Sequence, residues 1–221
     1  MLEVYYEDRE VIVVNKPAGV QSQASAAFSD DMVSLIKKHL LEGGAPSGTE
    51  PYVGVVHRLD TNVAGVMVYA KTKEAAAALS RQVQEGNIGK QYQAVVLGIP
   101  KEKNGTWTDW LRQEKKENVS VISNAKDKEA KKAELRYRLL GKKYLNGEQL
   151  SLLGIELVTG RHHQIRVQCA SRNMPVLGDV KYGSRKADRL YLVSSELSFT
   201  HPKTRKQMHF TGPQLSLDML S

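Results

Sequence analysis

The segment His57-Arg58-Leu59-Asp60 places an arginine two residues before a carboxylate, at the start of a polar turn. In an extended segment alternate side chains share a face, so Arg58 and Asp60 point one way and His57 and Leu59 the other. An ionised carboxylate can act as a nucleophile or as a base. An Asp at a strand end is also a common turn former or helix cap, and the pattern alone leaves both roles open.

Residues 159–168, TGRHHQIRVQ, are polar where a central strand of a sheet should be apolar. Charged groups such as Arg161 and Arg166 are costly to bury without partners, so they need either protein partners or bound phosphates. The alternative is an edge strand that faces water. His162 and His163 would point to opposite faces of an extended segment, which is poor geometry for sharing one metal ion.

The positive charge of the chain is concentrated in its last third. The 221 residues carry 32 Lys and Arg against 24 Asp and Glu, a net charge of +8. Residues 159–209 hold ten of the basic residues and three acidic ones, a net charge of +7. Such an excess, which includes Arg205 and Lys206, favours a polyanionic partner with salt-dependent binding. An ordinary lysine-rich surface is the alternative.

The composition also excludes several classes of site. Cys169 is the single cysteine, so the chain has neither an internal disulfide nor a multi-cysteine metal site, and we expect no metal. No stretch reaches the roughly 18–20 apolar residues of a membrane span, and the first residues do not resemble a signal peptide. We therefore expect a soluble, cytoplasmic protein, with a monomer as the default.

The first half of the chain reads as short strands and two helices. Val4–Gly19 is predicted to form two extended pieces around a polar turn at residues 7–10. A helix is predicted to open at residues 29–31 and to carry Met32, Leu35, Ile36 and Leu40 on one stripe, followed by a flexible loop at residues 43–48. Two further strands over residues 53–71 precede a helix that is capped by Thr72 and ends at Gly86.

The second half is predicted to be mostly extended. Tyr92–Leu97 is apolar and rich in β-formers, which favours a buried strand. Residues 112–134 mix both charge signs and read as a solvated hairpin or loop rather than a binding tail. Residues 135–221 are dominated by extended patterns. With neither a repeat nor a composition break, the economical model is one α+β domain, residues 1–221, built on a largely antiparallel sheet.

Together these segments resemble the RluA family of RNA pseudouridine synthases. The matching blocks occur in the family's order and span nearly the whole chain: VNKPAGV (14–20), HRLD (57–60), KQY (90–92), TGRHHQIR (159–166), PVLGDVKYG (175–183) and LSFTHPKT (197–204). The resemblance implies an α+β catalytic domain with a mixed, largely antiparallel sheet, flanking helices and a central active-site cleft. It also implies isomerisation of uridines in structured ribosomal RNA or tRNA, without a cofactor.

The resemblance also assigns roles to single residues. Asp60 is implied to be the catalytic carboxylate, acting on the sugar C1′ or on the uracil ring. Tyr92 would stack on the base and help to remove the C5 proton, Arg166 would pair with Asp60, and Arg58 would displace or replace the flipped base. Without the family, Tyr92 reads as ordinary core. Further RNA contacts are expected from six cations: Lys16, Lys90, Arg161, Lys181, Arg205 and Lys206.

The sequence departs from the family pattern at several positions. Val63-Ala64 stand where the family commonly has Thr-Ser, so two hydroxyl groups are missing, and Gln168 stands where many members have histidine. Many relatives also carry an amino-terminal S4 domain; only about fifteen residues precede the first matching block, so we expect no separate S4 domain here. A noncatalytic RNA-binding protein on the same fold stays an alternative. A glycoside hydrolase is a weaker one, because it needs a second carboxylate. Asp179 comes nearest to that and reads as structural.

Overall fold

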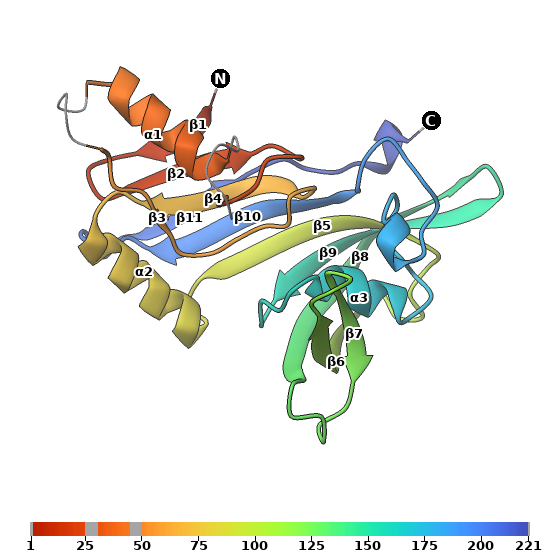
Figure 1. Ribbon diagram of the computed structural model, residues 1–221. Helices are drawn as coiled ribbons and strands as arrows, with labels where there is room; N and C mark the ends of the chain where they lie inside the picture. Colours follow the sequence, from red (N-terminus) through yellow and green to blue (C-terminus); the bar gives the residue numbers. More distant parts are fainter. Residues whose placement is uncertain (1, 25–30, 45–49, 221) are drawn as a thin grey trace. The chain divides into compact units, whose positions relative to one another are not determined.

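A computed structural model describes residues 2–24, 31–44 and 50–220. The chain divides into two compact units, each with its own core (Figure 1). The first unit comprises Met1–Lys90 and Ser194–Pro213, and the second comprises Gln91–Val193 and Gln214–Ser221. Both consist of antiparallel strand pairs with helices packed beside them, which is the predicted α+β class.

The first unit is a small sheet between two helices. Its strands follow the order β1-β2-β4-β10, with β3 also paired to β4 and β11 to β10. Figure 1 shows α1 on one side of this sheet and α2 on the other, and β2 is accordingly buried on both faces. The elements are β1 (Glu3–Glu7), β2 (Val11–Lys16), α1 (Met32–Glu42), β3 (Gly54–Val55), β4 (Ala64–Ala70), α2 (Lys73–Glu85), β10 (Leu192–Thr200) and β11 (Gln207–Thr211).

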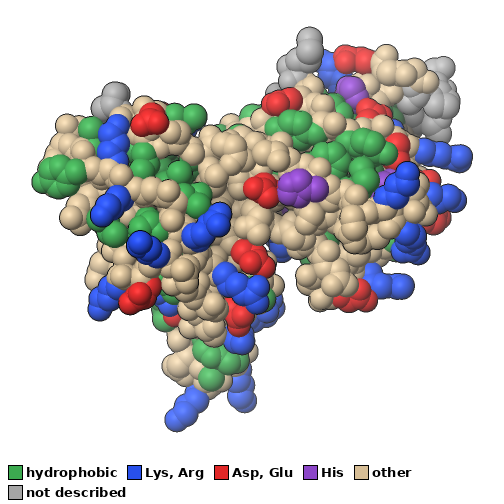
Figure 2. All heavy atoms as spheres, turned by 180° about the vertical axis from the view of Figure 1, so that it is seen from behind, with side chains coloured by type: hydrophobic (Ala, Val, Ile, Leu, Met, Phe, Trp, Pro, Cys, Tyr) green, Lys and Arg blue, Asp and Glu red, His purple; other side chains and the backbone are tan. Residues whose placement is uncertain are grey.

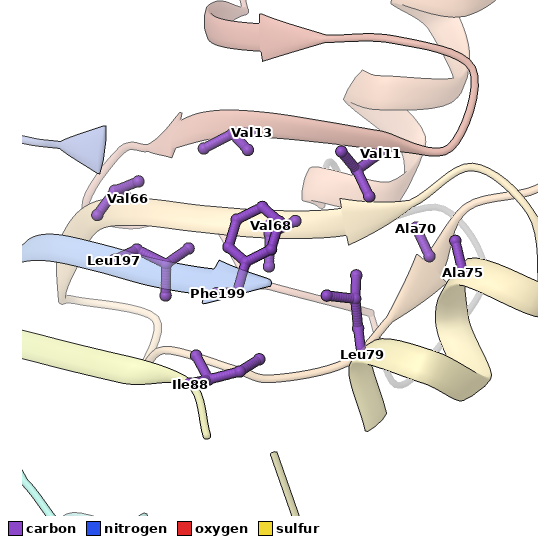
Figure 3. Packing of buried hydrophobic residues seen from close by; sticks show 10 residues of the cluster. All are labelled: Val11, Val13, Val66, Val68, Ala70, Ala75, Leu79, Ile88, Leu197 and Phe199. Atoms are coloured by element: carbon purple, nitrogen blue, oxygen red, sulfur yellow. The ribbon is translucent and has the colours of Figure 1, made fainter. Parts of the chain in front are cut away.

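The core of the first unit forms where α2 packs on the sheet. Alternate residues on neighbouring strands supply the apolar side chains of the sheet, and residues four apart on α2 cover them (Figure 3). The ten buried residues of this cluster are Val11, Val13, Val66, Val68, Ala70, Ala75, Leu79, Ile88, Leu197 and Phe199. The core therefore gives β4, and the loop that leads into it, a rigid base.

Local signals set the ends of both long helices. The Asp31 side chain caps α1 by accepting from Ser34 N–H at 2.7 Å. Thr72 caps α2 by accepting from Ala75 N–H at 3.1 Å, and Gly86 ends it at φ 74°, a backbone conformation that favours glycine. The caps of α2 were predicted, whereas for α1 the sequence predicted an opening at residues 29–31 and did not name Asp31 as the cap. The predicted start at residues 29–30 and most of the loop at 43–48 lie outside the described residues.

The second unit is a fully antiparallel sheet in the order β5-β9-β8-β6-β7. The predicted buried strand is β5, and the segment predicted as a solvated hairpin or loop, residues 112–134, comprises the end of β6, β7 and the start of β8. The elements are β5 (Gly89–Leu97), β6 (Asn104–Glu114), β7 (Val119–Ser123), β8 (Lys131–Leu145), β9 (Glu148–Leu157), α3 (Gln164–Ala170) and the 3₁₀ turns η1 (Val180–Tyr182) and η2 (Leu217–Met219).

The extended interpretation of residues 159–168 was wrong. The chain turns at His163, which has a left-handed backbone, and then forms α3 from Gln164 onward. The Gln164 side chain fixes this turn, because its Oε1 accepts from Thr159 Oγ1 at 2.8 Å and from Arg161 N–H at 3.0 Å. The rings of His162 and His163 do not point to opposite faces; they stack with their centroids 3.8 Å apart.

Candidate active site

Asp60 lies on the loop between β3 and β4 in the first unit. Leu59 is buried, Arg58 is exposed and Asp60 is half-buried, so the alternation predicted for this segment holds at these three residues. Val63 N–H donates to the Asp60 carbonyl at 3.0 Å and closes a turn directly after the carboxylate. The loop therefore holds exposed Arg58 and half-buried Asp60 on a fixed backbone.

Lys16 is fully buried at the end of β2 and holds the same loop. Its ammonium group donates to the carbonyl oxygens of Pro17 at 3.0 Å, Val20 at 2.7 Å and Thr61 at 3.0 Å. The pKa of Lys16 is lowered to about 8, mainly by burial. The negative charge of Asp60 acts in the opposite direction, but its effect is smaller. The side chain has no exposed surface for the predicted RNA contact, so its observed role is to tie the loop after Asp60 to β2.

His57 is neutral and faces the sheet of the first unit. Its Nε2 accepts from Val68 N–H at 3.1 Å, which places the ring proton on Nδ1. Burial, with a smaller contribution from the charge of Lys90, lowers the pKa of His57 to about 4. Lys90 is itself half-buried, and burial lowers its pKa as well. Near neutral pH, the His57 ring therefore adds no charge to the 57–60 segment.

Arg166 lies on α3 in the second unit, where Asp179 holds it. Nε and Nη2 of Arg166 donate to Oδ2 and Oδ1 of Asp179 at 2.7 and 2.8 Å. The guanidinium also lies over the Tyr182 ring, 5.0 Å from its centroid. Both partners are buried, with 10% and 1% of their side chains exposed. Two parallel hydrogen bonds and an aromatic face fix the plane of the guanidinium.

Asp179 is the partner that the sequence interpretation did not identify. It was read as structural, and Arg166 was assigned to Asp60 alone. The Asp179 carbonyl also accepts from Tyr182 N–H and Ser184 N–H, both at 3.0 Å, so one residue orders the 3₁₀ turn and orients the arginine. Asp179 is the acidic residue of an otherwise apolar and glycine-rich block at residues 175–183. This was the sequence signal that could have indicated a buried partner for an arginine.

The three predicted catalytic residues come from both units. Asp60 belongs to the first, whereas Arg166 and Tyr92 belong to the second. Tyr92 lies in β5 opposite Ile155 of β9 and is 7% exposed, which also fits a core residue. The pairing of Asp60 with Arg166 and the stacking role of Tyr92 stay predictions.

The other predicted RNA contacts are exposed cations. Arg161 donates to the Lys132 carbonyl at 2.9 Å, and Lys181 donates to the carbonyls of Glu117 and Asn118 at 3.3 and 3.2 Å. Arg205 and Lys206 are exposed at the turn between β10 and β11. Figure 2 shows Lys and Arg side chains interleaved with Asp and Glu over the face that it presents, rather than gathered into one patch.

His163 makes the second unit sensitive to acid. The Tyr182 hydroxyl accepts from Ser120 N–H at 2.7 Å and lies 2.9 Å from His163 Nδ1. The hydroxyl proton of Tyr182 is therefore directed at Nδ1 of a neutral imidazole ring. Burial above all, together with the charge of Arg166, lowers the pKa of His163 to about 3. The unfolded chain therefore binds a proton here between about pH 6.5 and pH 3, whereas the folded chain does not.

We expect the free energy of unfolding to fall as the pH drops through this window. Asparagine tolerates the left-handed backbone and keeps an acceptor for Tyr182, but it does not titrate. Between pH 7 and pH 4.5, the His163→Asn variant should lose roughly 2 kcal/mol less than the wild type. Urea unfolding at both pH values measures the difference. Equal losses in the two proteins would show that His163 does not carry this sensitivity.

Comparison with known proteins decides the family. The family model described as RNA pseudouridylate synthase matches residues 10–171, which include the Asp60, Tyr92 and Arg166 segments. The chain belongs to this family. Pseudouridine synthases are isomerases, so the enzyme class predicted from the sequence is confirmed.

Two relatives show how far the similarity extends. The chain is 32% identical over 222 residues to ribosomal large subunit pseudouridine synthase D of Zymomonas mobilis. The aligned region covers 95% of this chain and 68% of the relative. It is 31% identical over 214 residues to the dual-specificity RNA pseudouridine synthase RluA of Vibrio vulnificus, covering 91% and 79%. The RluA-type resemblance is thereby confirmed.

Solved structures of pseudouridine synthases share the fold. The human RNA pseudouridylate synthase domain containing 1 superposes with a TM-score of 0.81 at 22% identity, covering 100% of this chain and 86% of that one. The human domain containing 4 superposes with a TM-score of 0.80 at 18% identity. At these identities the likeness establishes the fold alone.

Two absences apply to the part of the chain that the structure describes. Within residues 2–24, 31–44 and 50–220, no group of three or more His, Cys, Asp or Glu side chains is arranged to hold a metal ion. Among the helices in these ranges, none is long and apolar enough to cross a membrane.

Proposed function

We propose that this pseudouridine synthase isomerises selected uridines in ribosomal RNA or tRNA. The observation that carries the proposal is the position of Asp60, the carboxylate of the matched HRLD block. It is half-buried on a loop whose backbone is hydrogen-bonded before it, at Leu59, and after it, at Thr61. The names of the relatives support an RNA substrate. We also propose that the chain acts as a monomer in the cytoplasm, which rests on the sequence predictions alone.

The proposed reaction moves one bond and replaces one proton. The C1′–N1 bond of uridine breaks, the uracil turns, and a C1′–C5 bond forms; C5 then loses its proton and N1 gains one, so the product is an isomer of the substrate. Asp60 acts on C1′ or on the ring, and therefore must be ionised. Arg166 would pair with the ionised carboxylate of Asp60 through charge-assisted hydrogen bonds.

A uridine inside structured RNA cannot reach a carboxylate without leaving its stack. Flipping the nucleotide costs a few kcal/mol, which contacts to the extruded base and to the flanking phosphates must offset. Tyr92 would stack on the uracil, and Arg58, exposed two residues before Asp60, would fill the vacated place. Both roles are taken from the family resemblance.

Tritium release tests the proposal directly. Ribosomal RNA and tRNA transcripts labelled with tritium at uridine C5 are incubated separately with the purified chain, and label released into water is counted. We expect release from one of the two classes, because C5 loses its proton in every turnover. RNA binding without release from either class would contradict isomerisation and favour the noncatalytic alternative. Mapping pseudouridines in cells with and without the gene then identifies the target.

The exposed cations at the β10–β11 turn are predicted to contact phosphate. Replacing Arg205 and Lys206 with Gln should weaken RNA binding. It should also reduce the slope of log K against log salt by about 1 to 2, because a protein with fewer phosphate contacts releases fewer counterions when it binds. Binding measured at several salt concentrations gives the slope. The matched control replaces Lys101 and Lys103, two exposed lysines, with Gln. An equal slope change in both variants would show only a general charge effect.

A further inference from the structure

Ser22 makes an unusual pair of hydrogen bonds to the residue before Asp60. Its Oγ accepts from Leu59 N–H at 3.0 Å and donates to the Leu59 carbonyl at 2.9 Å. One hydroxyl therefore satisfies both backbone groups of a single residue, as a neighbouring strand would. Leu59 is 8% exposed and Ser22 is 4% exposed, so water is not a ready substitute for either bond.

Ser22 is itself held from the other side. Its carbonyl accepts from the hydroxyl of Tyr69, a fully buried residue of β4, at 3.0 Å. The preceding residue, Gln21, accepts from Met32 N–H at 2.9 Å and so ties this segment to the start of α1. The hydroxyl of Ser22 is therefore a fixed point rather than a mobile surface group.

The bonds around Asp60 form a continuous set. Ser22 binds the backbone of Leu59, Val63 N–H binds the carbonyl of Asp60, and Lys16 Nζ and Gly19 N–H bind the carbonyl of Thr61 at 3.0 and 2.8 Å. Before Asp60 in the chain, the Ser22 side chain supports the backbone of Leu59, and the His57 side chain accepts from Val68 N–H. After Asp60, the Thr61 carbonyl is held both by the Lys16 side chain and by the Gly19 backbone amide.

We propose that Ser22 is a positioning residue that places the Asp60 carboxylate through the backbone of Leu59. The proposal rests on the function proposed above. Ser22 is buried, so it does not need to touch RNA to act. A displacement of a reacting group by about 1 Å can cost about 10²-fold in rate, and a loop released at Leu59 permits a displacement of that kind.

The test compares two serine-to-alanine variants that lose the same group. Ser22→Ala removes the hydroxyl at Leu59. Ser151→Ala removes an equally buried hydroxyl, which donates to the Gly98 carbonyl at 2.7 Å in the second unit. We expect kcat for tritium release to fall about 10- to 100-fold in Ser22→Ala with KM within twofold of wild type, and to stay near wild type in Ser151→Ala. If Ser22→Ala does not fold, Ser22→Cys, which keeps a weak donor of similar shape, takes its place.

Amide hydrogen exchange gives a second, structural measurement. The Leu59 amide should exchange slowly in the wild type and in Ser151→Ala, and markedly faster in the Ser22 variant. An equal kcat in the two serine variants, or an unchanged Leu59 exchange rate, would overturn the positioning role while leaving the proposed function intact. A wild-type chain that releases no tritium from any RNA would instead remove the proposed function, and the positioning role with it.

Discussion

Replacing Asp60 with Asn is expected to abolish tritium release from uridine C5 while RNA binding persists. The amide has nearly the same shape as the carboxylate, and the hydrogen bonds that hold the loop are made by the backbone of residues 59, 60 and 61. The variant should therefore fold and present the same surface. It lacks the negative charge needed to attack a carbon or accept a proton, and we expect turnover to fall by at least about 10³-fold.

The matched control is Asp218→Asn, which makes the same chemical change at an exposed residue beside the carboxyl terminus. Its turnover and affinity should both equal those of the wild type. Tritium release and RNA binding are measured on all three proteins under one set of conditions. If Asp60→Asn keeps wild-type turnover, Asp60 has no part in the chemistry. If it loses affinity in proportion to turnover, its role is in binding.

The same substitution has a consequence at Lys16. The charge of Asp60 opposes the lowering of the Lys16 pKa by burial. Removing that charge should lower the pKa of Lys16 further below about 8, which a pH titration followed by NMR of the labelled lysine side chain can measure. An unchanged Lys16 pKa would mean that the two groups do not interact.

Local signals explain why much of the first unit could be predicted. The caps of α2, Thr72 and Gly86, act within one turn of the helix, so the sequence contains the whole signal. The strands around the turn at residues 7–10 also follow from β-forming residues and turn residues over a short span. Elements of this kind depend on neighbours along the chain rather than on neighbours in space.

Long-range contacts explain what was missed. The polar segment at residues 159–168 reads as an edge strand, but the Gln164 side chain donates to the carbonyl of Glu134, thirty residues earlier, and supports a turn into α3. Ser22 lies thirty-seven residues before the peptide that it binds. Lys16 was predicted as an RNA contact because its charge was visible in the sequence, whereas its burial against the Thr61 carbonyl was not.

Breaking the buried pair of Arg166 and Asp179 should cause a large loss of stability in the second unit. Asp179→Asn keeps the shape of the side chain but replaces a charged acceptor by a neutral amide, which cannot accept from both Nε and Nη2 in the same way. A guanidinium with only 10% of its side chain exposed is then left without its buried counter-ion. We expect a loss of about 3 kcal/mol in the free energy of unfolding.

Glu148→Gln is the matched control, because it also replaces a carboxylate by an amide, and Glu148 pairs with Arg185 at 2.6 Å in a more exposed setting, with 39% and 43% of the two side chains exposed. Solvent screens that pair, so this substitution should cost less than about 1 kcal/mol. Urea unfolding at pH 7 measures both variants, and equal losses would contradict a special role for burial. Turnover adds a second criterion: if Asp179 also fixes the plane of Arg166 for catalysis, turnover per folded molecule should fall in Asp179→Asn and stay near wild type in Glu148→Gln. A loss of stability without that fall would assign the pair to folding alone.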